Sequence, residues 1–174
     1  MSLLVLLALF SALFFILALR FFLCLIPALA ALLALTARAC LLYRETQIDP
    51  LTGLFNRRRL SSDSRKFSSR RILTVFYLDL DHLKQINDTQ GHASGDRLLT
   101  ETADFLRTLS PAATAYRLGG DEFLVIFSQA PPETLSLPEN ISATCGSAQG
   151  PAADLPSLIH TAEQNMYQKR KHLT

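Results

Sequence analysis

"YRLGGDEFLVIF", residues Tyr116–Phe127, sets two adjacent glycines and two adjacent carboxylates between apolar runs. A Gly-Gly pair between such runs is typical of a tight turn, and the runs predict the two strands of a β-hairpin. A hairpin turn has no structural need for acids, yet Asp121 and Glu122 stand where the second strand begins. Their position indicates a function at this end of the hairpin.

A second acidic pair follows the run "ILTVFYL", residues 72–78. The run is free of charge and rich in β-branched and aromatic residues, so it predicts a strand buried on both faces. Side chains alternate along a strand, which places Asp79 and Asp81 on one face. A single strand-end Asp more often caps a turn. Two acidic pairs at strand ends instead favour a divalent cation such as Mg²⁺ or Mn²⁺, because gathered carboxylates repel one another.

The segment "KQINDTQGHASGD", residues 84–96, is predicted to be a polar turn region. It holds Lys84, Asn87, His92 and Asp96. An Asn amide and an Asp carboxylate held apart by a turn can hydrogen-bond a purine edge. These residue types are also ordinary in loops, and a lone His is more often structural than catalytic. At the hairpin, the turn formed by Gly119 and Gly120 would let phosphates approach the backbone closely.

The N-terminal segment is strongly apolar, and Arg20 is its only charge from Ser2 to Ala37. This is longer than the ~20 residues that one bilayer span needs. Two spans, Ser2–Leu19 and Phe21–Leu42, joined by a tight turn near Arg20, are the favoured interpretation. One long tilted helix is the alternative. A cleaved signal peptide fits less well, because the segment lacks a basic N-terminal region.

The charges after this segment indicate orientation and exclude one class of partner. Arg38, Arg44 and residues 57–59 are basic, so the positive-inside rule places the C-terminal part in the cytoplasm. Beyond Tyr43 there are 15 acidic and 15 basic residues, which is no electrostatic footprint for nucleic acid. Cys145 is the single cysteine of this part and cannot form an internal disulfide.

These patterns predict a membrane anchor at residues 1–43, a short linker at 44–48 and one domain at 49–174. The domain is expected to be an α/β fold, an α+β sandwich with helices packed on a sheet that contains antiparallel strands. Besides the strand and hairpin above, the expected elements are a helix from a Thr52 cap through Phe67, a helix at about Ser94–Leu109, a strand near Ile141–Ala148 and a helix at about Leu155–Lys171.

Five stretches of the chain resemble the GGDEF domain of bacterial diguanylate cyclases. They are "DPLTGLFNRR" at 49–58, "DLDHLKQIND" at 79–88, "GHASGD" at 91–96, "GGDEF" at 119–123 and "AEQNMYQKRK" at 162–171. The resemblance covers essentially everything from Asp49 onward. It implies a nucleotide-cyclase-like, ferredoxin-like sheet with flanking helices, preceded by the transmembrane segment.

The resemblance also implies an activity. Members of the family join two GTP molecules into cyclic di-GMP and release two pyrophosphates. Each domain holds one GTP, so a homodimer is expected, with the bilayer as a further partner and no nucleic acid. The expected location is the bacterial inner membrane, multi-pass or single-pass, with the catalytic domain in the cytoplasm. Mg²⁺ or Mn²⁺ is the expected cofactor.

Residue roles follow from the resemblance by position. Asp79, the Leu80 carbonyl and Asp121 are expected to bind metal, with Asp121 also the expected proton acceptor and Glu122 a nearby acid of the metal site. The expected substrate contacts are Asn87 and Asp96 for guanine, His92 beside the nucleotide, Lys84 and Arg170 for phosphates, and Gly119 and Gly120 in the phosphate-binding turn.

Three departures from the family pattern leave an alternative open. Ser128–Asn140 contains three prolines and little periodicity, so the usual helix is expected to be shortened or lost and one side of the sheet poorly covered. The family's terminal Arg is missing before Thr174. "SPAA" at 110–113 replaces the family's "RxxD" product-inhibition site, so no feedback site of that type is expected. The alternative is a catalytically silent domain that binds GTP and regulates a partner.

Overall fold

The structure, a computed structural model, describes residues 3–65, 67, 71–109, 111, 113–128 and 131–173. The chain divides into two compact units, Met1–Glu45 and Thr46–Thr174. In the first unit a single helix, α1 (Leu3–Glu45), continues through Arg20 and contains Pro27. The expected turn near Arg20 is therefore not formed, and α1 corresponds to the alternative of one long helix. Its segment Leu6–Tyr43 is long and apolar enough to cross a membrane.

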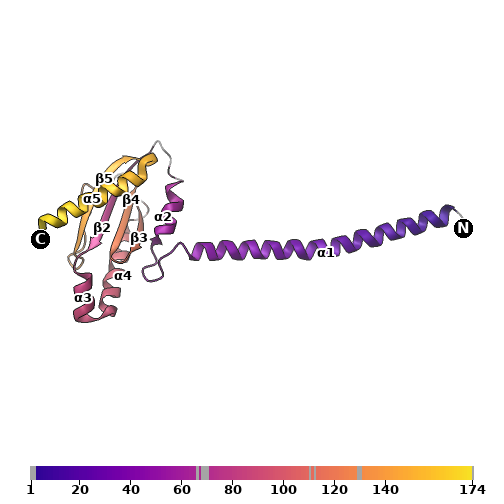
Figure 1. Ribbon diagram of the computed structural model, residues 1–174, viewed down its shortest axis with the longest axis horizontal. Helices are drawn as coiled ribbons and strands as arrows, with labels where there is room; N and C mark the ends of the chain where they lie inside the picture. The colour runs from indigo at the N-terminus through magenta and orange to yellow at the C-terminus, as the bar shows by residue number, and fades with distance from the viewer. Residues whose placement is uncertain are drawn as a thin grey trace. The chain divides into compact units, whose positions relative to one another are not determined.

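The second unit is built on a five-stranded sheet (Figure 1). The strand order is β1-β3-β4-β2-β5. Among the described residues, β1 and β3 pair in parallel and the other neighbouring strands pair antiparallel. The predicted hairpin is confirmed as β3–β4. The strand predicted at residues 72–78 is the start of β2, which is exposed at Ile72 and buried from Leu73 to Leu80. The strands are β1 (Phe55–Asn56), β2 (Ile72–Leu80), β3 (Ala113–Gly119), β4 (Glu122–Phe127) and β5 (Ala143–Pro151).

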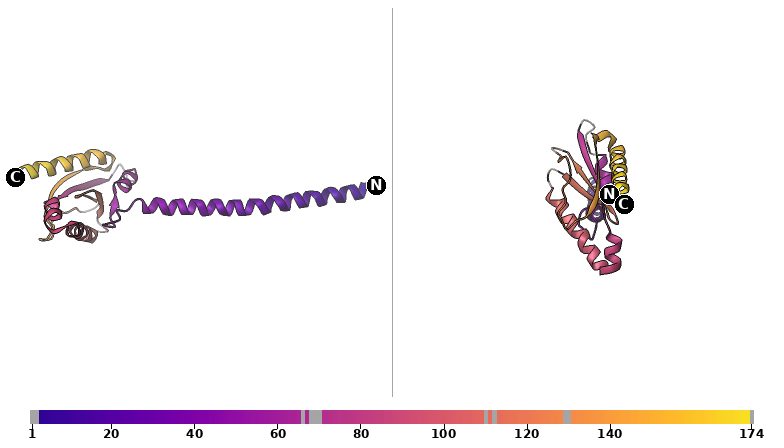
Figure 2. Two further views of the ribbon diagram at one scale, coloured as in Figure 1. Left: turned by 60° about the horizontal axis from the view of Figure 1, so that its bottom comes forward. Right: turned by 90° about the vertical axis from the view of Figure 1, so that its left-hand side faces the viewer.

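Helices cover both faces of the sheet, as the alternation along β2 requires (Figure 2). Phe76 and Leu78 belong to one buried cluster, with side chains of α3 (Leu83–Gln90) and α4 (His92–Thr108). Val75 and Tyr77 belong to the other cluster, with side chains of α5 (Leu155–Leu173). Both faces of β2 are therefore buried, and the predicted α+β sandwich is confirmed.

The first helix of the domain begins later than expected, so the predicted Thr52 cap is wrong. Helix α2 (Arg57–Ser64) is capped by Asn56, whose side chain accepts hydrogen bonds from two backbone N–H groups in the first turn. Thr52 instead donates its backbone N–H and its hydroxyl to Asp49 Oδ1, at 2.9 and 2.6 Å. Phe55 pairs with Tyr116 as part of β1 and is not available to a helix.

The predicted polar turn at residues 84–96 is also wrong, because most of it is helical. Helices α3 and α4 meet at Gly91, whose φ of +85° breaks the helical path between them. The other boundaries differ from the expected ones by a few residues: β2 continues to Leu80, β5 covers 143–151, and α5 extends to Leu173.

The stretch after β4 covers the sheet without regular structure. Its described residues, 128 and 131–140, contain no helix or strand, as expected for a lost helix. Leu135 and Leu137 nevertheless pack on the α4 side of the sheet, and Phe76 and Phe127 there are no more than 4% exposed. The expected poor coverage is therefore wrong. In "SPAA", Ser110 and Ala112 lie outside the described residues.

Close packing between β5 and α5 leads to a stability prediction. A Cβ on Gly146 would overlap the α5 backbone at Ala162 and Met166, whereas a Cβ on Gly150 would meet only the end of the Leu158 side chain. Gly146→Ala is expected to lower the free energy of unfolding by about 3 kcal/mol, the range of strong overpacking. The matched control Gly150→Ala should lower it by less than about 1 kcal/mol, because Leu158 can rotate. Urea unfolding of the full chain in detergent micelles tests this, and equal losses would contradict it.

Candidate functional site

The ends of β2 and β4 bring two carboxylates side by side. Asp79 and Glu122 are directly opposed residues of these antiparallel strands, so their side chains share a face. Asp79 is only 8% exposed. The Tyr77 hydroxyl donates a hydrogen bond to Glu122 Oε1 at 2.9 Å. Burial raises the pKa of Tyr77, and the hydrogen-bonded Glu122 carboxylate raises it further, so the phenol keeps its proton.

The Gly-Gly turn joins β3 to β4 and is tied to β2. Gly119 and Gly120 have φ of +151° and +50°, a combination that residues with a Cβ rarely adopt. The Arg117 guanidinium donates to the Gly120 carbonyl from Nε and Nη2, at 3.1 and 2.7 Å. The Leu80 N–H donates to the Asp121 carbonyl at 3.1 Å. The acidic turn is thus held against the end of β2.

A hollow of about 390 Å³ lies at this edge of the sheet. It collects five of the predicted site residues from three separate parts of the chain. Its full lining is Asp79, Leu80, Asp81, His82, Leu83, Lys84, Asp121, Thr144 and Arg170.

Arg170, from α5, places a cation between two carboxylates of the hollow. Its Nη2 lies 2.6 Å from Asp79 Oδ1 and 3.4 Å from Asp81 Oδ1. The hydrogen bond to Asp79 is the main cause that raises the pKa of Arg170. Asp81 also accepts hydrogen bonds from the hydroxyls of Ser142 and Thr144, at 3.0 and 2.8 Å. The Asp81 carboxylate is therefore occupied by Ser142 and by Thr144 of β5, whereas the Asp79 carboxylate accepts from Arg170 alone among the described residues.

The oxygen donors of the hollow fit a hard divalent cation. The Asp79 carboxylate already holds a cationic group, and the Asp121 carboxylate has no hydrogen-bond or ion-pair partner among the described residues. Among the residues that the structure describes, no group of three or more His, Cys, Asp or Glu side chains is arranged to hold a metal ion by itself. Mg²⁺ is usually held by one or two carboxylates, with phosphates and water completing its shell. The hollow therefore suits a cation that arrives with a phosphate-bearing molecule.

The residues expected to bind guanine lie on the neighbouring α3–α4 pair and do not line the hollow. The Asn87 amide, on α3, packs against buried Gly95 of α4 so closely that a Cβ there would overlap it. Asp96 follows Gly95 and is exposed, and His92 is an exposed residue at the start of α4.

Three contributors to this edge were not predicted from the sequence. Tyr77 bonds Glu122, and Arg57 of α2 places Nη2 3.8 Å from Glu122 Oε2. Arg117 holds the turn and also pairs with Asp49 Oδ1 at 3.0 Å. For Tyr77 a signal existed, because a phenol in an otherwise apolar strand needs a polar partner when it is buried.

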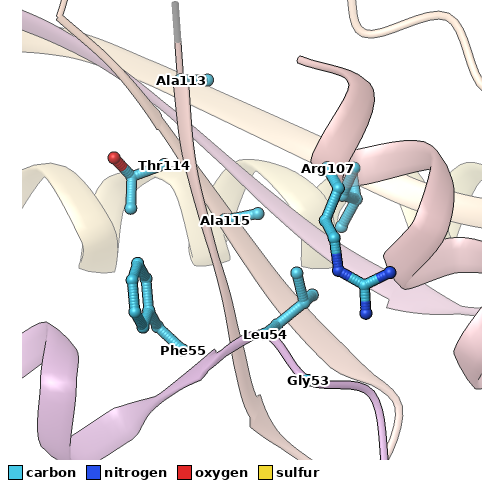
Figure 3. Close-up of a pocket in the computed structure, with 8 residues that line it drawn as sticks. Gly53, Leu54, Phe55, Arg107, Ala113, Thr114 and Ala115 are labelled. Atoms are coloured by element: carbon cyan, nitrogen blue, oxygen red, sulfur yellow. The ribbon is translucent and has the colours of Figure 1, made fainter. Parts of the chain in front are cut away.

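A second hollow, of about 450 Å³, lies between β1, β3 and the end of α4 (Figure 3). The described residues that line it include Leu54, Phe55 and Thr114, and none of them is a carboxylate. Its one charged residue, Arg107, bonds the Asp104 carboxylate and the Thr52 carbonyl. This hollow lacks the oxygen donors of the Asp79 site.

The fold and the acidic edge define a class: a ferredoxin-like domain that gathers carboxylates and basic groups beside a glycine turn at one edge of its sheet. The family model described as "Diguanylate cyclase, GGDEF domain" matches residues 46–151. The chain belongs to this family.

Relatives and solved structures agree on the domain. Diguanylate cyclase DgcN of Escherichia coli K12 is 37% identical over 142 residues, which is 76% of this chain and 32% of DgcN. Cyclic di-GMP phosphodiesterase PdeB of Shewanella oneidensis is 42% identical over 84 residues, 47% of this chain and 10% of PdeB. The coiled coil and GGDEF domain of DgcB from Caulobacter crescentus has the same fold, with a TM-score of 0.69, 22% identity and coverage of 85% and 93%. The chain thus spans about a third of DgcN and a tenth of PdeB.

Proposed function

We propose that this chain is a diguanylate cyclase that acts as a homodimer at the bacterial inner membrane. It condenses two GTP molecules into cyclic di-GMP and releases two pyrophosphates. The observation that carries the proposal is the hollow beside the Gly-Gly turn, where Asp79, Asp121, Lys84 and Arg170 meet. Membership of the GGDEF family and the similarity to DgcN support it.

The substrate is bound in two parts. Lys84 and Arg170 supply positive charge for the phosphates, and Gly119 and Gly120 leave the backbone of the turn open to them. Asn87 and Asp96 bind the guanine edge on the adjoining α3–α4 pair, with His92 beside the nucleotide. This division matches a long ligand whose phosphates lie at the sheet edge and whose base lies between the helices.

The carboxylates hold the cation and take the proton. Asp79, the Leu80 carbonyl and Asp121 would bind Mg²⁺ or Mn²⁺, with Glu122 beside them. When bound, the cation neutralises phosphate charge and aligns the attack. In each of the two condensations, the 3′-oxygen of one GTP bonds to the α-phosphorus of the other. The bond from that phosphorus to the bridging oxygen of the β-phosphate breaks, and pyrophosphate leaves. Asp121 accepts the proton of the attacking hydroxyl.

Two copies of the domain are needed because each holds one GTP and each supplies one attacking hydroxyl. Residues 1–43 form the anchor, 44–48 the linker and 49–174 the catalytic domain. The apolar length of Leu6–Tyr43 supports insertion in a bilayer, and the arginines that follow favour a cytoplasmic domain. Anchoring confines two copies to one plane and raises their effective concentration.

A second function is a silent domain that binds GTP and regulates a partner. The loss of the helix between β4 and β5 favours it, as does similarity to a relative named as a phosphodiesterase. Binding without turnover distinguishes this function from the first.

The test uses full-length protein in nanodiscs, incubated with GTP and Mg²⁺. Cyclic di-GMP is followed by anion-exchange chromatography, and binding is measured separately with a GTP analogue whose α,β-bridging oxygen is replaced by methylene. Formation of cyclic di-GMP supports the proposal. Binding without product supports the silent domain, and the absence of both contradicts the two functions together.

A further inference from the structure

Tyr77 carries a buried hydroxyl that none of the roles above uses. It lies two residues before Asp79 on β2 and is 3% exposed. Its ring belongs to the buried cluster between the sheet and α5, together with Leu73 and Val75 on the same strand face. A phenylalanine would bury the same apolar surface, so the hydroxyl has a separate reason to be there.

The hydroxyl contacts a residue of the acidic turn. Tyr77 OH donates to Glu122 Oε1 at 2.9 Å, across from β2 to β4. Because Glu122 is directly opposed to Asp79, this bond fixes the Glu122 carboxylate on the face that carries Asp79. The donor is rigid, since its ring is packed in the core.

A second contact, with an exposed arginine, reaches the same carboxylate from the solvent side. Arg57 Nη2 lies 3.8 Å from Glu122 Oε2, and the Arg57 side chain is 68% exposed. Exposed pairs at this distance contribute little, because solvent screens them and the long side chain loses freedom. The buried phenol therefore decides where the carboxylate lies as long as it is present.

We propose that Tyr77 is a positioning residue that holds the Glu122 carboxylate beside Asp79 and thereby strengthens cation binding at the acidic edge. Oε1 accepts the phenol hydrogen bond, and Oε2 exchanges its weak contact with Arg57 for the cation when the cation binds. Without the hydroxyl, Glu122 turns toward Arg57 and leaves the cation site. The inference rests on the proposed function for the nature of the site, but it concerns cation binding and not turnover.

The test is a Mn²⁺ titration of full-length protein in nanodiscs, in the presence of the methylene GTP analogue. Enhancement of water-proton relaxation by Mn²⁺ reports the protein-bound ion. Tyr77→Phe is expected to raise the apparent dissociation constant of Mn²⁺ about tenfold, the lower end for loss of a group that orients a metal ligand. Repeating Tyr77→Phe in a Glu122→Gln background should give no further change.

Tyr116→Phe is the matched control. Tyr116 is as buried as Tyr77 and lies in the same cluster, and it donates its hydroxyl at 3.1 Å to Asp63 Oδ2, a carboxylate of α2 that is not part of the acidic turn. Tyr116→Phe removes an equivalent hydrogen bond from the core but leaves the acidic turn untouched. It should therefore change the apparent dissociation constant of Mn²⁺ by less than about twofold.

Each outcome decides the inference. An unchanged constant in Tyr77→Phe, an equal rise in Tyr116→Phe, or a further change in the Glu122→Gln background overturns it. Failure of the wild-type protein to bind Mn²⁺ overturns both the inference and the cation role of the hollow. If the variants change Mn²⁺ binding as expected but the wild-type protein forms no cyclic di-GMP, the inference stands and the proposed function is refuted.

Discussion

Cyclic di-GMP formation should fall about a thousandfold when Asp121 is replaced by asparagine. Asparagine keeps the size and one oxygen of the side chain but removes the negative charge and the proton acceptor. General-base catalysis alone contributes roughly 10²–10⁴ in rate, and Asp121 is also proposed to hold the cation. Because the free Asp121 carboxylate has no partner among the described residues, its loss should leave the fold intact.

The measurement compares initial rates and analogue binding for full-length protein in nanodiscs. Analogue affinity should stay within about threefold of wild type at saturating Mg²⁺, since Lys84 and Arg170 remain for the phosphates. Glu133→Gln is the control, because it makes the same carboxylate-to-amide change at an exposed position of the stretch after β4. More than a tenth of wild-type activity in Asp121→Asn would refute the catalytic assignment.

The main strands and the acidic edge could be predicted because their determinants are local. The Gly-Gly pair between apolar runs indicates one hairpin by itself. The run "ILTVFYL" indicates a buried strand because it is β-branched, aromatic and uncharged. Alternation then places Asp79 and Asp81 on one face, which the Arg170 contacts confirm. The sequence alone did not show that only Asp81 has hydroxyl partners, since these come from Ser142 and Thr144, more than 60 residues further along the chain.

The incorrect predictions concern segments whose contacts in the folded domain override the structure that their residue types favour locally. Thr52 has the side chain of a helix cap, but Asp49 takes both of its donors, and the chain extends to pair Phe55 with Tyr116. The polar segment at 84–96 has many loop residues, but only Gly91 interrupts the helix. Capping residues and turn residues overlap in type, so composition could not distinguish these cases.

The unpredicted site residues have partners that are distant in the sequence. Tyr77 and Glu122 are 45 residues apart, and Arg117 and Asp49 are 68 apart. Neither pairing can be inferred from spacing, because it depends on strand order. The sheet order β3-β4-β2 is what brings Glu122 next to Tyr77.

The second large effect is expected for Arg117, which joins the start of the domain to the Gly-Gly turn. Its guanidinium bonds Asp49 Oδ1 at 3.0 Å and the Gly120 carbonyl at 3.1 and 2.7 Å. The two side chains of the ion pair are 12% and 20% exposed. Removing one partner of a buried pair costs 3–5 kcal/mol, so with this residual exposure Arg117→Met should lose roughly 2–3 kcal/mol.

Turnover should also fall in this variant, about 100-fold, because Arg117 no longer holds the Gly120 carbonyl of the turn that presents Asp121. Asp49→Asn is the companion variant: it breaks the ion pair but leaves both bonds from Arg117 to Gly120. It should therefore retain most of the turnover while losing stability. Equal turnover in the two variants would show that Arg117 acts only through the ion pair.

The pH dependence of stability separates charge pairing from packing. Burial is the largest single influence on Asp49 and acts to raise its pKa, but hydrogen bonds from Thr52 and Arg117 with the Arg117 charge outweigh it and lower the pKa overall. A carboxylate whose folded pKa is depressed contributes stability that is present above its unfolded value of about 3.9 and is lost as pH falls through the folded pKa. The difference in free energy of unfolding between wild type and Arg117→Met should therefore have its maximum value at pH 7 and should become smaller below about pH 4. Urea unfolding followed by tyrosine fluorescence, in a chain without tryptophan, measures it. A difference that stays constant with pH would mean that Arg117 stabilises the domain through packing of its stem and not through its charge.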